Sequence, residues 1–201
     1  MDLKDVQPYI EGKICMVTGG GGSIGSEIVR SLSKLNAEKI VIVDIYENGA
    51  YSVKCEVGDK VTVEIASVRD YEKMDCIMNK YRPDIVFHAA AHKHVPFMEL
   101  NPEEAVKNNV KGTETVADLA EKYNADNFVL ISTDKAVEPI SVMGASKRCC
   151  EMYVYEKLLK SKHTKFSAVR FGNVLNSNGS VIPLFKKQVE NGVVTLSLIH
   201  I

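Results

Sequence analysis

Hydrophobic residues along this chain follow two alternating patterns. Short runs rich in Val and Ile, four or five residues long, are separated by longer segments in which apolar residues return every three or four positions. Short apolar runs are typical of buried parallel strands, and the longer period is typical of helices. The predicted strands span residues 13–17, 39–43, 61–65, 84–88, 128–131 and 166–170.

The segments between these runs predict helices. After the first strand, apolar residues recur at helical spacing at Ile24, Ile28, Leu32 and Leu35. Further helices are predicted over 71–81, 102–122 and 143–160. Strands that alternate with helices in this way predict an α/β fold, a doubly wound parallel sheet of the Rossmann type with helices on both faces.

Length and composition fit one globular domain. The chain has 201 residues, of which 25% are charged and 45% hydrophobic, and its formal net charge is −1. This balance does not favour non-specific binding to nucleic acid, and no apolar run approaches the ~20 residues that cross a bilayer. We expect a dinucleotide-binding domain over residues 1–192. The largely apolar end, residues 193–201, is expected to be a truncated or aberrant tail.

The cysteines and the first residues indicate a cytoplasmic protein. The cysteine count is odd and no two cysteines are spaced as C-x-x-C, so reduced thiols are expected. The segment from Met1 to Asp5 shows no signal-peptide pattern. The five cysteines are Cys15, Cys55, Cys76, Cys149 and Cys150.

A glycine-rich loop follows the first strand and opens the first helix. The segment from Thr18 to Gly25 satisfies both G-x-G-x-x-G and T-G-x-x-G-x-x-G. Glycines let the backbone approach a pyrophosphate, and the helix N-terminus offers free N–H groups and a positive dipole end. The alternative is a flexible turn without a ligand. The predicted cofactor contacts in this loop are Thr18, Gly19, Gly22, Ser23, Ile24 and Gly25.

The second strand ends in a carboxylate with the spacing of a ribose ligand. Asp44 follows Gly25 by 19 residues, as in dinucleotide-binding domains. Its charge would repel a 2′-phosphate, so the sequence favours NAD as the cofactor. NADP stays open because a loop arginine or lysine could override that repulsion. No lysine follows the last glycine, which excludes a P-loop.

Several longer phrases match a known family in order. Together they resemble the extended short-chain dehydrogenase/reductases, and more closely the CapD-like polysaccharide-biosynthesis branch, which includes UDP-N-acetylglucosamine 4,6-dehydratases and nucleotide-sugar epimerases. The resemblance covers residues 3 to 192 and implies a UDP-sugar substrate and a homo-oligomer. Longer members carry membrane helices before this region and a sugar-covering region after it, and we expect both to be absent here. The phrases are His88–Ala91, His92–Glu99, Ser132–Val137, Val142–Arg148 and Arg170–Leu175.

The resemblance assigns roles to residues after the fifth strand. Asp134 is the expected acid toward the C6 oxygen, Lys135 the base at C5 and Thr133 a hydrogen-bond partner of the sugar hydroxyl. Lys147 is expected to hold the nicotinamide ribose. A lysine acts as a base only where burial or positive charge lowers its pKa, and a carboxyl is protonated more readily in a poorly solvated site. The alternative is a capping aspartate beside a solvated lysine.

The implied reaction oxidises the sugar only transiently. A hydride leaves C4 for the nicotinamide, water is lost across C5 and C6, and the hydride returns to C6. The tyrosine usual in such sites is replaced by Met143, which cannot transfer a proton. Which group removes the C4 hydroxyl proton is therefore open between Asp134 and a water held by Thr133.

Further contacts follow from the resemblance. Ala89 and Ala90 are small residues after the fourth strand, where the cofactor would lie close to the backbone, and Asp70 is placed to contact adenine or to cap a helix. Lys93 and Asn173 are expected substrate contacts, although Lys93 could also be an exposed loop lysine. No metal site is predicted, because the nearby histidines have no completing carboxylate or cysteine.

Two other functions compete with dehydration. An epimerase of the same branch would return the hydride to C4 and needs no acid at C6. A dinucleotide-binding fragment would hold the cofactor without turnover, because the sugar-covering region is missing.

Overall fold

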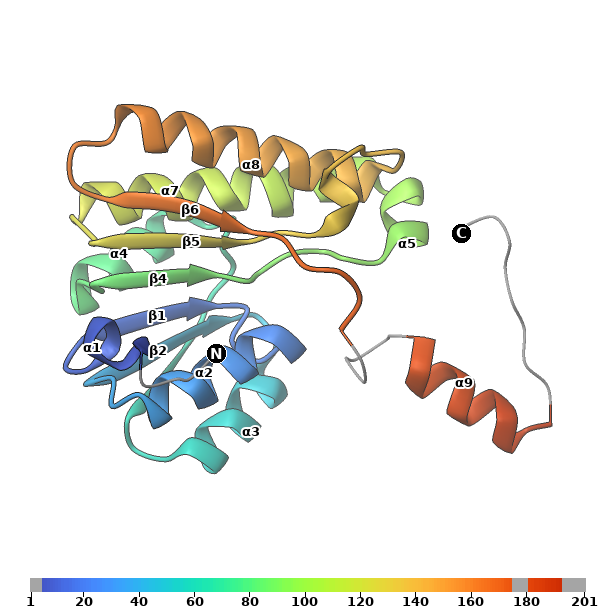
Figure 1. Cartoon of the computed structure of the whole chain (residues 1–201), viewed down its shortest axis with the longest axis horizontal. Coiled ribbons are helices and arrows are strands. Elements are labelled where there is room, and N and C mark those ends of the chain that lie inside the picture. Colours follow the sequence, from blue (N-terminus) through green and yellow to red (C-terminus); the bar gives the residue numbers. More distant parts are fainter. Residues whose placement is uncertain (1–4, 175–180, 193–201) are drawn as a thin grey trace.

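The computed structural model describes residues 5–174 and 181–192. Within them, six parallel strands form one sheet in the order β3-β2-β1-β4-β5-β6, which confirms the predicted Rossmann-type α/β fold (Figure 1). The strands are β1 (Ile14–Thr18), β2 (Lys39–Asp44), β3 (Val61–Ile65), β4 (Ile85–His88), β5 (Asn127–Ile131) and β6 (Lys165–Val169).

Helices connect the strands and cover the sheet. They are α1 (Gln7–Ile10), α2 (Ser23–Lys34), α3 (Glu47–Val57), α4 (Tyr71–Tyr81), α5 (Val95–Leu100), α6 (Pro102–Ala105), α7 (Gly112–Lys122), α8 (Val142–Lys160) and α9 (Val181–Glu190). A π-helical turn (Val106–Lys111) joins α6 to α7, and a short 3₁₀ turn (Asp134–Ala136) follows β5.

The strand order reverses between β1 and β4. Met16 on β1 lies opposite Val41 of β2 on one side and opposite Val86 of β4 on the other. The loops after β1 and β4 therefore diverge at the carboxyl edge of the sheet, where open α/β sheets bind their ligands. Most residues that the sequence assigned to the site lie in the loops that follow strands at this edge, whereas Lys147 lies within α8.

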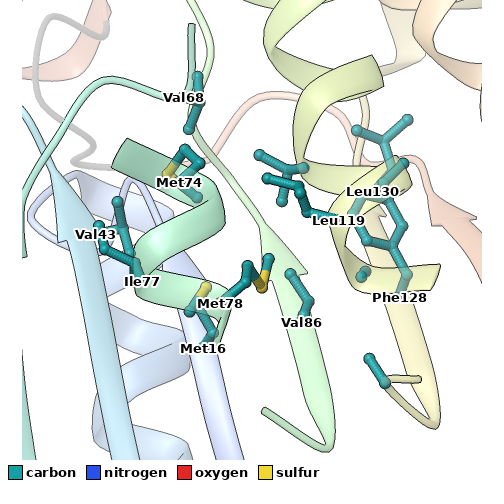
Figure 2. Packing of buried hydrophobic residues seen from close by; sticks show 14 of the residues in the cluster. Met16, Val43, Val68, Met74, Ile77, Met78, Val86, Leu119, Phe128 and Leu130 are labelled. Atoms are coloured by element: carbon teal, nitrogen blue, oxygen red, sulfur yellow. The ribbon is translucent and has the colours of Figure 1, made fainter. Parts of the chain in front are cut away.

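Two apolar layers hold the helices to the sheet, because successive side chains of a strand point to opposite faces. On one face, Met74 and Ile77 of α4 and Leu119 of α7 pack on Met16 and Phe128 (Figure 2). On the other face, helices α2 and α3 pack on a second cluster of buried strand residues. Each fully buried side chain of this size contributes roughly 1.5–3 kcal/mol.

The predicted elements are present, and the ends of most strands are shifted by one residue. The helical features that were not predicted are α1, α3, α5, α9, the 3₁₀ turn and the π-helical turn. Helix α3 begins with Glu47-Asn48-Gly49, and Asn and Gly are poor helix formers, so no helix was predicted there. The predicted continuous helix over 102–122 contains the π-helical turn, in which Asn109 is buried. A π-turn inserts one residue for a tertiary contact, and periodicity cannot show it.

The second face of the sheet is covered unevenly among the described residues. Helices α2 and α3 lie over β1, β2 and β3, whereas Val169 on β6 is 46% exposed. Figure 1 shows α9 apart from these layers. The predicted tail at residues 193–201 lies outside the described residues.

None of the described helices is long and apolar enough to pass through a membrane. The five cysteines are all free thiols, and Cys15 and Cys150 are buried. The cytoplasmic location stays a prediction.

Candidate dinucleotide and active site

The glycine loop passes close against the segment that follows β4. Gly19 has a left-handed φ of 70°, and its N–H donates to the Val43 oxygen at 2.8 Å. A Cβ on Gly19 would lie 2.7 Å from the Ala90 nitrogen and 2.8 Å from the Ala89 carbonyl carbon. Only glycine fits there, so the structure brings the predicted loop together with Ala89 and Ala90.

The helix after the loop starts without a capping side chain. Gly22 is the N-cap residue of α2 and has extended backbone, so it offers no side-chain acceptor to the first turn. A Cβ on Gly25 would lie 2.1 Å from the Gly19 oxygen, which shows how closely helix and loop pack. Backbone N–H groups at such a helix start bind phosphate oxygens. The loop therefore fits a pyrophosphate at Ser23 and Ile24.

Thr18 supports this loop from inside the protein. Its hydroxyl lies 2.7 Å from Nδ1 of His88, and Nε2 of His88 lies 3.0 Å from the Thr113 hydroxyl. Thr113 donates its proton to the Asn109 oxygen at 2.6 Å, so it accepts from Nε2–H, and Nδ1 of His88 accepts from Thr18. Thr18 has no exposed surface, and its hydroxyl is engaged by His88. Its direct contact with the cofactor stays a prediction.

His88 is held as a neutral imidazole. Complete burial, together with the charge of Lys147, lowers the pKa of His88 to about 3. Both of its ring nitrogens are engaged by hydroxyl groups, which leaves neither available to a metal ion. Among the residues that the structure describes, no cluster of His, Cys, Asp or Glu could hold a metal.

Asp44 lies at the predicted place beside the loop. Its Oδ2 accepts from the Gly21 N–H at 2.8 Å and its Oδ1 from the Tyr46 N–H at 2.9 Å. A hollow of about 290 Å³ opens here, lined by Gly21, Tyr46 and Arg30 among others. The guanidinium of Arg30 is already paired with Glu56 at 2.7 Å.

Asp70 is the N-cap residue of α4, which is one of the two roles predicted for it. Its Oδ1 accepts from the Lys73 N–H at 3.0 Å at the start of α4. The contact with adenine stays a prediction.

Asn109, one of the residues that carry the resemblance to the extended short-chain dehydrogenase/reductases, links two segments of the site, although no role was predicted for it. In the π-helical turn its amide oxygen accepts from the His92 N–H at 2.8 Å, and its amide nitrogen donates to the His92 oxygen at 3.1 Å and to Ser146 Oγ at 2.9 Å. It thus ties the loop that carries the exposed Lys93 to α8, one residue before Lys147. The apolar pattern carried no signal for a polar residue buried in this way.

Lys147 is buried without an anionic partner. Its residue is 4% exposed, and within residues 5–174 and 181–192 its ammonium makes no hydrogen bond or ion pair. Burial lowers the pKa of Lys147, against the smaller influence of Cys150 and Glu151. A buried ammonium with unfilled donors fits the hydroxyls of a ribose, which is the role that the resemblance implied.

The residues assigned to chemistry come together after β5. Asp134 Oδ1 accepts from Thr133 Oγ1 at 2.8 Å and from Lys135 Nζ at 3.1 Å. Lys135 Nζ also donates to Asn173 Oδ1 at 3.3 Å, and the Asp134 N–H donates to the Phe171 oxygen at 3.1 Å. The loops after β5 and β6 therefore form one polar cluster.

The predicted acid role of Asp134 required a poorly solvated site, but this cluster is open to solvent. The side chains of Asp134 and Lys135 are 53% and 41% exposed. The hydrogen bond from Thr133, followed by that from Lys135, holds the pKa of Asp134 below its ordinary value. The ionised carboxylate is thus the resting form, and Lys135 lies beside an anion rather than buried beside a cation.

Helix α8 begins directly against this cluster. A Cβ on Gly144 would lie 2.4 Å from the Lys135 carbonyl oxygen, so only glycine allows the contact. Met143 packs with Met98 and Ala105 in a small apolar cluster. Met143, which stands in place of the usual tyrosine, is thus part of the core packing.

A comparison with protein families decides the classification. The family described as "Polysaccharide biosynthesis protein" matches residues 15–201. The chain belongs to this polysaccharide biosynthesis family. The resemblance drawn from the sequence motifs is confirmed.

Proteins similar to this chain are named for different activities. The chain is 52% identical over 198 residues to the probable polysaccharide biosynthesis protein EpsC of Bacillus subtilis, covering 96% of this chain and 33% of EpsC. It is 35% identical to a UDP-N-acetylglucosamine 4,6-dehydratase (inverting) of Campylobacter jejuni, covering 90% of this chain and 55% of that protein. It is 39% identical to a UDP-glucose 4-epimerase of Rickettsia canadensis, and the match covers 90% of this chain and 54% of that protein.

Solved structures agree with the fold of this family member. The X-ray structure of Pen from Bacillus thuringiensis has a TM-score of 0.86 at 33% identity, covering 94% of this chain and 62% of that chain. A UDP-glucose 4-epimerase of Thermotoga maritima, solved with UDP-glucose, has a TM-score of 0.78 at 26% identity, covering 89% and 63%. The chain thus spans between a third and two thirds of the length of these relatives.

Proposed function

We propose that this family member is the cofactor-binding and catalytic part of an NAD-dependent nucleotide-sugar 4,6-dehydratase in polysaccharide biosynthesis, acting on UDP-N-acetylglucosamine. The observation that carries the proposal is the cluster of Asp134, Lys135 and Asn173, which joins the loops after β5 and β6 at the carboxyl edge of the sheet. Elimination of water needs both an acid and a base, and this cluster supplies one carboxyl and one amine. The dehydratase from Campylobacter jejuni supports the same reaction class.

The cofactor site favours NAD over NADP. The Asp44 carboxylate ends β2 beside the glycine loop, so it would bind a ribose 2′-hydroxyl, and its charge would repel a 2′-phosphate. Arg30, the cation that lines the adjacent hollow, is already paired with Glu56 and Glu27. Lys147 would hold the ribose next to the nicotinamide through its unfilled donors.

The lowered pKa of Asp134 suggests an order for the proton transfers. When bound, the dinucleotide supplies oxidation at the sugar C4 and reduction at C6. The ionised Asp134 accepts the proton of the C4 hydroxyl and later delivers it to the C6 oxygen, which leaves as water. Lys135 is the proposed base, which takes the C5 proton and returns it to C5 after the water has left. Each residue ends in its starting form, and the net change is the loss of one water.

A transplant experiment tests the proposed reaction. The chain replaces the matching segment of EpsC, with which it shares 52% identity, and the product is made from UDP-N-acetylglucosamine in deuterated water. We expect a 4-keto-6-deoxy sugar nucleotide with deuterium at C5, because the C5 proton exchanges on Lys135. NMR of the same product reports the configuration at C5. A product that keeps its C6 hydroxyl would refute dehydration.

An epimerase is the second candidate. The relative from Rickettsia canadensis and the structure from Thermotoga maritima are both UDP-glucose 4-epimerases. An epimerase would yield the C4 epimer with no deuterium at C5, so the same experiment separates the two reactions.

The proposed assembly is a homo-oligomer that pairs through α8. This helix exposes an apolar stripe that includes Met152, Tyr155 and Leu159. A stripe of this kind on a surface helix is typical of an interface.

A further inference from the structure

One buried carboxylate joins three elements of the candidate site. Glu151 lies on α8, one helical turn after Lys147, and is buried. Its Oε1 accepts from Ser132 Oγ at 2.6 Å and from Arg170 Nε at 2.8 Å. Its Oε2 accepts from Arg170 Nη2 at 2.6 Å and from Arg148 Nη1 at 3.2 Å.

Two of these partners stand immediately before the loops of the site. Ser132 precedes Thr133 and Asp134 after β5, and Arg170 precedes Phe171 after β6. The Ser132 N–H also donates to the Val169 oxygen at 2.8 Å. Glu151 therefore fixes the points at which both loops leave the sheet.

The charge on Glu151 is retained despite its burial. Burial opposes the charge, yet hydrogen bonds from Arg170, Ser132 and Arg148 hold the pKa of this carboxyl below its ordinary value. Buried ion pairs are often no more stabilising than well-packed apolar residues. A two-pronged contact with arginine does fix orientation, because both bonds must align at once. The orientation that this cluster imposes on the two loops therefore explains it better than a contribution to folding stability does.

We propose that Glu151 is a positioning residue, which sets the register of the β5 and β6 loops and thereby holds Asp134 and Lys135 against Asn173. The chemistry of this role rests on the proposed dehydratase function. The positions of the two loops do not depend on that function, so this part of the proposal can be tested without measuring turnover.

The test is the titration of the Asp134 carboxyl carbon, followed by ¹³C NMR in the full chain. Thr133 and Lys135 face Asp134 from its own loop, and Gly172 approaches it from the β6 loop. Asn173 of the β6 loop orients the Lys135 ammonium, so the hydrogen bond from Lys135 to Asp134 weakens if the two loops shift relative to each other. In Glu151→Gln we expect the Asp134 titration to move up by about 0.5 pH units or more, because that hydrogen bond weakens. In the control Glu156→Gln, which removes an exposed carboxylate paired with Lys160 on the same helix, it should match the wild type.

Several outcomes decide the proposal. An Asp134 titration in Glu151→Gln equal to that of the wild type overturns it, even if the variant melts at a lower temperature. If Glu151→Gln does not fold, Ser132→Ala breaks the link from the strand side, and the same upward shift is expected. In the EpsC transplant, kcat should fall about 100-fold with little change in KM, because the reacting groups are misplaced by about 1 Å. If the EpsC transplant without the Glu151 substitution shows no turnover, that result counts against the proposed dehydratase function and leaves the proposed role of Glu151 unaffected.

Discussion

The carbonyl oxygen of Gly19 lies only 2.1 Å from the point where a Cβ on Gly25 would sit. The oxygen belongs to the backbone of a loop whose left-handed residue is itself in contact with Ala89 and Ala90. The loop cannot retreat in that direction, because the backbone of Ala89 and Ala90 lies against it. The position of the whole glycine turn therefore depends on the absence of one methyl group.

Replacing Gly25 with alanine should separate the loop from α2. We expect Gly25→Ala to lower the free energy of unfolding by about 1–3 kcal/mol, as overpacking does, and to abolish detectable NAD binding. Calorimetry for binding and urea unfolding for stability give the two values. Lys34→Ala, at the exposed end of the same helix, should change neither. Normal NAD affinity in Gly25→Ala would refute the role of the loop.

Replacing Lys147 with methionine should change binding and stability in opposite directions. Methionine keeps the apolar stem and removes a buried charge that has no anionic partner in the described residues, so we expect the free energy of unfolding to rise by about 1 kcal/mol. NAD affinity should fall about 10-fold to 100-fold, the equivalent of one charge-assisted hydrogen bond. A merely structural lysine would instead show lower stability with unchanged affinity. Lys160→Met serves as the exposed control on α8.

His88 should make the protein sensitive to mild acid. Its pKa is about 3 in the folded protein and about 6.5 in an unfolded chain, so only the unfolded chain takes up a proton as the pH falls below 6.5. Its contribution to stability is complete above pH 6.5 and is lost progressively down to pH 3. Between pH 7 and pH 5, urea unfolding of the wild type should lose about 2 kcal/mol more than that of His88→Gln. Equal losses in the two proteins would contradict the neutral, buried imidazole.

The cysteines should fall into two reactivity classes. Burial raises the pKa of Cys15 to about 12 and also raises that of Cys150, so neither forms a thiolate near neutral pH. Cys55 and Cys76 are exposed and should react with a thiol reagent within minutes. Mass spectrometry of the labelled peptides measures this difference. Rapid labelling of Cys15 in the folded protein would show that β1 is not in the core.

The exposed stripe on α8 should control the assembly state. Met152→Glu places a charge in the proposed interface and should convert a homo-oligomer into a monomer, as light scattering would show. Cys149 lies three residues earlier on the same surface, so it should label faster in the variant than in the wild type. If the wild type is already a monomer at high concentration, the proposed interface is wrong.

Much of the site could be predicted because its signals are local. The glycine loop, Asp44 and the Asp134–Lys135 pair each follow a strand that apolar periodicity reveals. In a parallel sheet, all such positions gather at one edge. The fold and the neighbourhood of these residues thus follow from short-range pattern together with one topological rule.

Other features depend on contacts between distant segments, which no local pattern encodes. The burial of Thr18 against His88, the π-helical turn that points Asn109 at His92, and the ionised state of Asp134 all arise only once separate elements have packed. Glu151 is the clearest case. A charged residue on a helix is expected to be exposed, but here Ser132 and Arg170, at the ends of two strands, hydrogen-bond to it in the interior. The sequence by itself determined which residues stand at the carboxyl edge. Tertiary structure decided which of them are buried, charged or free to meet a ligand, because solvation and hydrogen bonding depend on neighbours in space.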